Sequence, residues 1–209
     1  MNKKYAIFDM DGTLIDSMGI WRNLGREYLI SKGITENIED TIEEIAPLTM
    51  SESATLFVER FSLHSDAEGV AKEMNGIMDS HYKNDIPLKK GVKEYLESLK
   101  ESGVRMCVAS ATAEFLMMAC LDRLGVLSYF DFILSCETMS TSKREPDIYL
   151  EVAKRFEAQP KEIAVYEDAK YAIETAKNAG FYIIAVYDEE AEKHWKQICE
   201  LADETMDFN

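Results

Sequence analysis

The sequence predicts an α/β fold: a doubly wound, Rossmann-like parallel sheet with an all-helical domain inserted into it. Three observations support this prediction. An apolar run at Tyr5–Phe8 is long enough for a buried strand. Residues 18 to about 86 then show helical patterns but no convincing strand. From Pro87 onward, short apolar runs alternate with segments of helical periodicity, which is typical of a parallel sheet covered by helices on both faces.

The helical block follows the first strand and precedes all the others, so it is expected to be an insertion and not a separate tandem domain. We expect an α/β core domain over residues 1–15 and 88–209 and a helical domain over residues 16–87. Within the helical domain the pattern predicts four helices: 21–32, 36–46 stopped by Pro47, one capped at Ser51, and one capped by Ser65 or Asp66.

The core domain is expected to contain five strands. After Tyr5–Phe8 these are residues 104–109, 132–134, 163–166 and 182–187. The predicted helices are 91–102, 113–124, 147–156, a segment that follows Asp168 and ends at Ala179, and 189–202. If the first strand is central, with the second and third on one side and the fourth and fifth on the other, the first and fourth strands are neighbours. The strand order then reverses between them, at the place where open α/β sheets bind ligands.

The composition limits the possible partners. The 209 residues carry a formal net charge of −16, and so acidic a surface repels nucleic acid and anionic lipid. No apolar run approaches the roughly 20 residues of a membrane helix, and the N-terminal pattern is not that of a signal peptide. The four cysteines are scattered, which favours buried reduced thiols. We therefore expect a cytoplasmic protein, a monomer or weak dimer, with no nucleic-acid or membrane partner.

Two carboxylates, Asp9 and Asp11, directly follow the first strand and precede Gly12 and Thr13. In extended geometry residues two apart point the same way, so these carboxylates repel each other unless a cation lies between them. Mg²⁺ prefers oxygen ligands of this kind and commonly accompanies a phosphate group. The alternative interpretation is an ordinary β-turn, because Asp and Gly are common turn residues.

Other polar residues follow later strands, and each also has a structural interpretation. Ser110 follows the second strand and is also a possible helix N-cap. Glu167 and Asp168 follow the fourth strand, where they also suit a helix N-terminus. Lys143 is also compatible with a solvated surface charge. If the predicted strand order is right, the acids at 9, 11, 167 and 168 converge, and such a group is costly to bury without a metal.

These residues together resemble the four motifs of the haloacid dehalogenase superfamily. The motifs are Asp-Met-Asp-Gly-Thr at 9–13, Ser110 after an apolar strand, Lys143 shortly before a Pro-Asp pair, and the acidic pair Glu167-Asp168. The resemblance covers residues 1–15 and 88–188. The helical insertion is similar to the small cap of the subfamily that includes phosphoglycolate phosphatases and β-phosphoglucomutases.

The resemblance implies an enzyme that hydrolyses a small phosphate ester. Asp9 is then expected to attack phosphorus and form an aspartyl-phosphate, and Asp11 to act as general acid and then general base. An acid at position 11 favours phosphoryl transfer over dehalogenation. The resemblance also implies a set of ligands: Asp9, the backbone carbonyl of Asp11, Asp168 and, through water, Glu167 for Mg²⁺; and Ser110, the Ala111 amide and Lys143 for the phosphoryl oxygens.

The helical domain bears on the choice between a phosphatase and a mutase. β-Phosphoglucomutases carry a His in the first cap helix and an Arg in a cap loop, whereas this chain has Trp21 in the first place and no Arg over residues 47–53. This favours a phosphatase, although Arg22 or Arg60 are alternative cations. A phosphomutase of the same fold and a non-catalytic binding protein remain the rival hypotheses.

The candidates for lining the substrate pocket are Trp21, Thr49 and Met50. Trp21 is equally compatible with a place in the core of the cap. Residues 15–19 and 84–90 are the expected hinges between the two domains.

Overall fold

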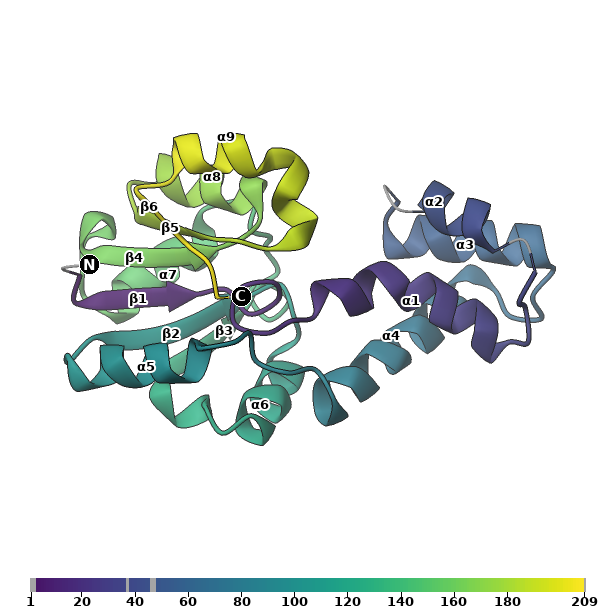
Figure 1. The fold of residues 1–209 in the computed structure, drawn as a ribbon, viewed down its shortest axis with the longest axis horizontal. Coiled ribbons are helices and arrows are strands. Elements are labelled where there is room, and N and C mark those ends of the chain that lie inside the picture. The colour runs from purple at the N-terminus through teal and green to yellow at the C-terminus, as the bar shows by residue number, and fades with distance from the viewer. Residues whose placement is uncertain (1–2, 37, 46–47, 209) are drawn as a thin grey trace. The chain divides into compact units, whose positions relative to one another are not determined.

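The computed structural model describes residues 3–36, 38–45 and 48–208. The chain divides into two compact units, one formed by Met1–Met18 with Ile86–Asn209 and the other by Gly19–Asp85. The first is an α/β unit and the second is helical (Figure 1).

The α/β unit is built on one six-stranded sheet. All neighbouring strands pair in parallel, in the order β3-β2-β1-β4-β5-β6. The strands are β1 (Tyr5–Phe8), β2 (Arg105–Ser110), β3 (Phe132–Ser135), β4 (Ile163–Glu167), β5 (Tyr182–Val186) and β6 (Glu204–Met206). The predicted order of the first five strands is confirmed. The edge strand β6 was not predicted, because three residues with little apolar character do not form a strand signal.

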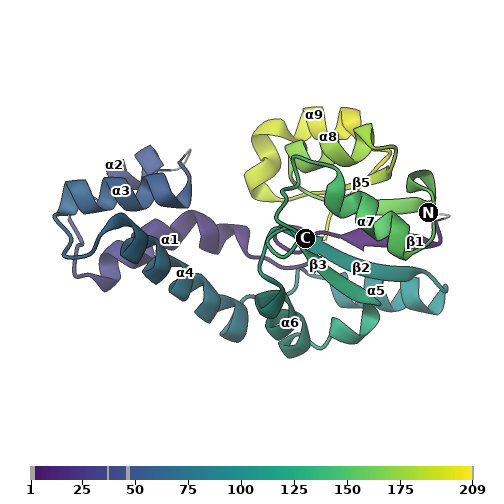
Figure 2. The same ribbon diagram turned by 180° about the vertical axis from the view of Figure 1, so that it is seen from behind.

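Helices cover both faces of this sheet. They are α5 (Val92–Glu101), α6 (Glu114–Arg123), α7 (Asp147–Arg155), α8 (Lys170–Asn178) and α9 (Trp195–Leu201). Helix α5 lies in front of the sheet in Figure 1, and α7 lies in front in the reverse view of Figure 2. One core cluster packs α7, α8 and α9 against alternate strand residues such as Ile7, Val165 and Ile183. The predicted doubly wound α/β class is confirmed, while the last predicted helix is a 3₁₀ segment, Glu189–His194, followed by α9.

The two connections to the helical unit pair with each other inside the α/β unit. Ile15 and Leu88 form an antiparallel bridge, and the Lys89 amide donates to the Leu14 carbonyl at 2.9 Å. The Lys89 side chain is buried, where its ammonium contacts the carboxylate of Asp188 at 2.8 Å and donates to the Tyr187 carbonyl at 2.8 Å.

The helical unit contains α1 (Met18–Ser31), α2 (Glu39–Ile45), α3 (Met50–Phe61) and α4 (Ala67–Asn84). The prediction that Ser51 caps the third helix is wrong, because Thr49 caps α3 in a reciprocal box with Glu52. Asp66, and not Ser65, caps α4 by accepting a hydrogen bond from the Gly69 amide at 2.8 Å. The predicted stop of the second helix at Ala46 and Pro47 lies outside the described residues. Stacked rings of Tyr28 and Phe57 lie in the core of this unit.

Within the described part of the chain, no helix has both the length and the apolar character needed to cross a bilayer. Cys107, Cys120 and Cys136 are buried as expected, whereas Cys199 is exposed on α9.

Candidate functional site

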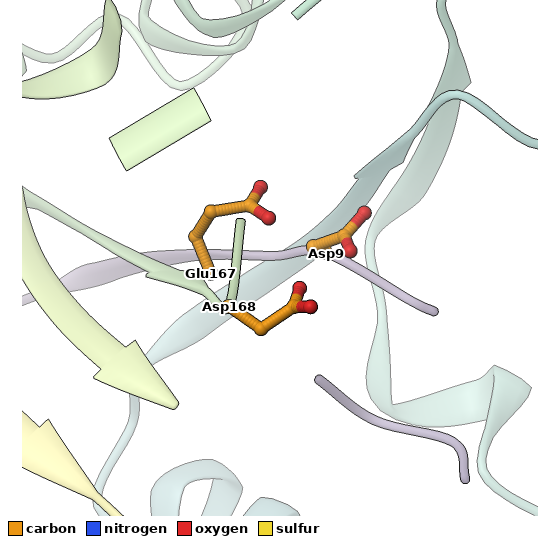
Figure 3. Close-up of side chains that lie close together, drawn as sticks. All are labelled: Asp9, Glu167 and Asp168. Carbon is orange, nitrogen blue, oxygen red and sulfur yellow. The ribbon is translucent and has the colours of Figure 1, made fainter. Parts of the chain in front are cut away.

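The register of β1 and β4 places three carboxylates together at the carboxyl edge of the sheet. Phe8 pairs with Tyr166, and the Asp9 amide donates to the Tyr166 carbonyl at 3.0 Å, so Asp9 and Glu167 leave neighbouring strands at the same level. Asp168 follows directly. Oxygens of Asp9, Glu167 and Asp168 all lie within 4.8 Å of one another, and all three residues are buried (Figure 3).

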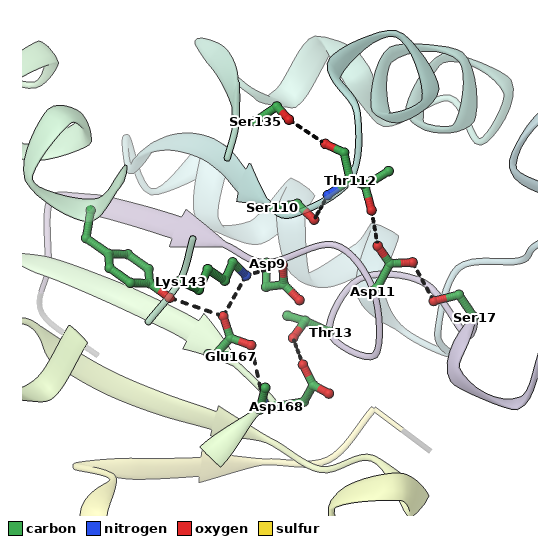
Figure 4. A network of polar contacts seen from close by, with 12 residues as sticks. Asp9, Asp11, Thr13, Ser17, Ser110, Thr112, Ser135, Lys143, Glu167 and Asp168 are labelled. Atoms are coloured by element: carbon green, nitrogen blue, oxygen red, sulfur yellow. Dashed lines mark hydrogen bonds and ion pairs between the residues drawn. The ribbon is translucent and has the colours of Figure 1, made fainter. Parts of the chain in front are cut away.

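Lys143 supplies the positive charge of this group. It lies between β3 and α7, is buried, and its ammonium is ion-paired with the Asp9 carboxylate and with Glu167 at 2.7 Å (Figure 4). Burial alone would lower the pKa of Lys143, but the Asp9 and Glu167 carboxylates outweigh it and raise that pKa, so the lysine is charged. The Tyr149 hydroxyl lies 3.5 Å from the same Glu167 oxygen.

Three buried carboxylates face one ammonium, so the group has an excess of negative charge. Burial, followed by the charge of Glu167, raises the pKa of Asp9 to about 7, and the same two causes raise the pKa of Asp168. A shared cation removes this repulsion, and an all-oxygen donor set suits a hard ion. The residues therefore fit Mg²⁺.

Gly12 and Thr13 hold the Asp168 side chain in place. The Thr13 hydroxyl donates to Asp168 Oδ1 at 3.3 Å. Gly12 has φ of +75°, and a Cβ atom at this position would lie 2.5 Å from Asp168 Oδ2. Only glycine combines this left-handed backbone with such a close approach to the carboxylate.

The Asp11 carboxylate is held by two hydroxyl groups. Its two oxygens accept hydrogen bonds from the Ser17 hydroxyl at 2.7 Å and the Thr112 hydroxyl at 2.6 Å (Figure 4). The extended geometry expected from Asp9 to Asp11 is replaced by a turn after Phe8, in which the Leu14 amide donates to the Met10 carbonyl, and the shared direction of the two carboxylates stays a prediction. The structure thus brings together the acids at 9, 167 and 168, and the use of the Asp11 carbonyl as a ligand stays a prediction.

Ser110 ends β2 and belongs to a loop at the same edge of the sheet. Its hydroxyl oxygen accepts from the Thr112 amide at 3.2 Å. It is not the N-cap of α6, since that position is Ala113, which makes no side-chain capping bond. Ala111 is exposed at the tip of this loop.

Two of the candidate pocket residues of the helical unit, Trp21 and Thr49, have hydrogen-bond partners inside that unit. Trp21 Nε1 donates to the Tyr82 hydroxyl at 3.2 Å, which is compatible with a place in the core of the cap, and its place in the substrate pocket stays a prediction. Thr49 is the α3 cap, and Met50 is the first residue of that helix. Arg60, one of the alternative cations, pairs with Glu44 at 2.6 Å and donates to Thr41 at 3.1 Å.

Four polar residues of the site were missed from the sequence. Thr13 and Ser17 lie within or next to the first motif, and Thr112 lies two residues after Ser110, so proximity to a motif was an available signal. Tyr149 lies on the buried side of α7 and carries no sequence signal that separates it from the core.

Comparison with known proteins decides the family. The haloacid dehalogenase-like hydrolase family matches residues 6–186. The chain belongs to this family. The predicted superfamily, and with it an enzyme of the hydrolase class, is confirmed.

Relatives in this family include two phosphatases. The phosphorylated carbohydrates phosphatase of Thermotoga maritima is 28% identical over 84% of this chain and 81% of its own length. Fructose-1-phosphate phosphatase YqaB of Escherichia coli is 30% identical over 89% of this chain and 98% of its own. Among solved structures, a candidate β-phosphoglucomutase from Thermotoga maritima has a TM-score of 0.83 at 26% identity, over 98% of this chain and 94% of its own.

Proposed function

We propose that the protein is a Mg²⁺-dependent phosphatase that hydrolyses a small phosphorylated metabolite, a sugar phosphate or similar phosphomonoester, through an aspartyl-phosphate. The observation that carries this proposal is the buried group of Asp9, Lys143, Glu167 and Asp168 at the edge of the sheet. The names of the phosphatase relatives favour a sugar phosphate.

Asp9 is the nucleophile. Its carboxylate attacks phosphorus, and the bond from phosphorus to the leaving oxygen breaks as Asp11 gives that oxygen a proton. Water then attacks the aspartyl-phosphate while Asp11 takes a proton from it, which releases phosphate and restores Asp9. Lys143 lowers the repulsion between the Asp9 carboxylate and the incoming phosphate, because its charge lies against that carboxylate.

The phosphoryl oxygens are bound by Lys143, the Ser110 hydroxyl and the Ala111 amide. Asp9, Asp168, the backbone carbonyl of Asp11 and, through water, Glu167 would hold Mg²⁺. When bound, the ion supplies charge that offsets the repulsion between nucleophile and phosphate.

The helical unit acts as a cap in this proposal, with domain limits at residues 16 and 87. It would exclude water during the first transfer, and Trp21, Thr49 and Met50 would contact the part of the substrate that does not react. The protein would work in the cytoplasm as a monomer or weak dimer, and its net charge of −16 disfavours nucleic acids and anionic membranes.

A phosphomutase is the second candidate, favoured by the likeness to the candidate β-phosphoglucomutase. A mutase must bind a second phosphate, which calls for a further cation. Arg60 is engaged with Glu44 and Thr41 inside the helical unit. This engagement counts against Arg60 as the second cation and so favours the phosphatase, whereas Arg22 stays an alternative cation.

The test is phosphate release from a panel of phosphorylated metabolites, with and without Mg²⁺, by wild type and Asp9→Asn. We expect Mg²⁺-dependent release that the substitution lowers by a factor of about 10³ or more, because the nucleophile is lost, with the circular dichroism spectrum unchanged. Interconversion of sugar phosphate isomers without net release, followed by ³¹P NMR, would establish the mutase instead. Turnover of no substrate on the panel would favour a non-catalytic protein.

A further inference from the structure

Thr112 links three strand ends of the α/β unit through its three polar groups. Its amide donates to Ser110 Oγ at 3.2 Å, at the end of β2. Its carbonyl accepts from Ser135 Oγ at 2.8 Å, at the end of β3. Its hydroxyl donates to Asp11 Oδ2 at 2.6 Å, in the turn after β1 (Figure 4).

We propose that Thr112 is a positioning residue, which ties the carboxylate of Asp11 to the loop that binds the transferring phosphoryl group. This inference rests on the proposed roles of Asp11 and of the Ser110–Thr112 loop. It adds that the Thr112 hydroxyl holds the acid and the phosphate-binding loop together.

The need for such a residue follows from the place of Asp11. The residue lies in a turn beyond the strand and is partly exposed, so the sheet ladder does not fix its side chain. Ser17 binds one of its oxygens and Thr112 the other, which sets the plane of the carboxylate. Of these two donors, only Thr112 belongs to the phosphate-binding loop.

Threonine suits this task better than serine. Its branched Cβ restricts χ1, so the hydroxyl is already directed when the loop forms. The two backbone hydrogen bonds of Thr112 fix the loop independently of that hydroxyl. The shape of the loop and the position of Asp11 can therefore be separated by substitution.

Thr112→Val removes the hydroxyl and keeps the shape and both backbone bonds. The matched control is Ser135→Ala, which removes a bond that shapes the loop and leaves the Asp11 contact intact. The readout is kcat/KM for an alkyl phosphate, whose leaving group needs a proton, and for p-nitrophenyl phosphate, whose leaving group does not. The full-length protein with Mg²⁺ is used throughout.

We expect Thr112→Val to lower kcat/KM for the alkyl phosphate by about 10- to 100-fold, a part of what general acid catalysis supplies. The loss for p-nitrophenyl phosphate should be less than about threefold by the same reasoning. Thr112→Ser should restore most of the alkyl phosphate activity. Ser135→Ala should lower kcat/KM for both substrates by the same factor.

An equal loss for both substrates in Thr112→Val, or no loss, would overturn the inference. If the valine variant does not fold, Thr112→Ala takes its place with the same criteria. Asp11→Asn separates the inference from the proposed function. If Asp11→Asn shows no leaving-group dependence, the role of Asp11 itself is wrong; if it does and Thr112→Val does not, only the positioning role fails.

Discussion

The two units of the chain differ in whether they bury ion pairs. The α/β unit buries two groups of ion pairs: the side chains of Lys89 and Asp188 are only 4% and 6% exposed, and Lys143 is as deeply buried with its two acids. Exposed pairs also occur in this unit, such as Lys177 with Asp203 at 36% and 28% exposure. In the helical unit, Arg60 and Glu44 pair at the surface with 38% and 50% exposure. Exposed pairs form at little cost and stabilise little, whereas buried charges persist only where a specific arrangement retains them.

This difference indicates which charged residues belong to a specific buried arrangement. The buried pairs of the α/β unit mark the candidate active site and the connection beside it. The exposed pairs of the helical unit, such as Arg60 with Glu44, are ordinary surface contacts of a small acidic domain. Measurements of stability and activity can sharpen or break this contrast.

The largest effect on stability is expected from Lys89→Met. The substitution leaves the Asp188 carboxylate buried without its cation and the Tyr187 carbonyl without that donor. Breaking such a pair from one side costs about 3–5 kcal/mol. The free energy of unfolding in urea is the measurement, and Asp188→Asn in the same chain should recover part of the loss.

Arg60→Met in α3 is the matched control for the exposed class. Its pair with Glu44 should contribute about 0–1 kcal/mol to the free energy of unfolding. Equal losses in Lys89→Met and Arg60→Met would remove the contrast between the units.

The sequence could predict this contrast only in part. Parallel strands align their carboxyl ends, so the residues after β1, β2 and β4 could be assigned to one edge of the sheet from the alternation of strands and helices alone. The burial of Lys89 could not be predicted. A lysine in a connection looks like any surface lysine in the sequence, and its partner Asp188 lies 99 positions later, from 89 to 188.

The orientation of Asp11 shows the same limit at short range. Extended geometry applied only up to Phe8, and the turn beyond it depends on the left-handed Gly12. The contact with Thr112 spans 101 positions in the sequence. The helix cap at Thr49 was predictable, because Thr49-Met50-Ser51-Glu52 has the spacing of a capping box, although Ser51 is also a common type of capping residue.

The next effect in size concerns Mg²⁺ and pH. In the metal-free protein the pKa of Asp9 is raised to about 7, so between its ordinary value and about 7 the folded state keeps a proton that the unfolded state releases. Stability of the metal-free protein should therefore fall as pH rises through this range. Mg²⁺ competes with that proton, so it should stabilise the fold more at pH 7.5 than at pH 5.

Thermal unfolding with and without Mg²⁺ at the two pH values is the measurement. At a concentration 100 times its dissociation constant, the ion should add about 2.7 kcal/mol. Asp168→Asn should remove most of this stabilisation, while Asp85→Asn in the helical unit should keep it. A Mg²⁺ effect that is equal at both pH values would show that the ion does not bind where Asp9 titrates.

The smallest effect is expected from Thr49→Ala. Its hydroxyl accepts from the Glu52 amide at 3.3 Å, and the Glu52 carboxylate accepts from the Thr49 amide at 2.8 Å. Loss of the N-cap side chain should lower the free energy of unfolding by about 1 kcal/mol. Thr55→Ala is the matched control, because Thr55 is also exposed on α3 and its hydroxyl donates to the Ser51 carbonyl within the helix. That change should be close to neutral, since alanine has the higher helix propensity.

The same two variants test the proposed contact with substrate: if Thr49 serves only as a cap, KM is the same in both, and if it also lines the pocket, KM rises in Thr49→Ala alone. A stability loss in Thr55→Ala as large as that in Thr49→Ala would show that α3 does not depend on its cap.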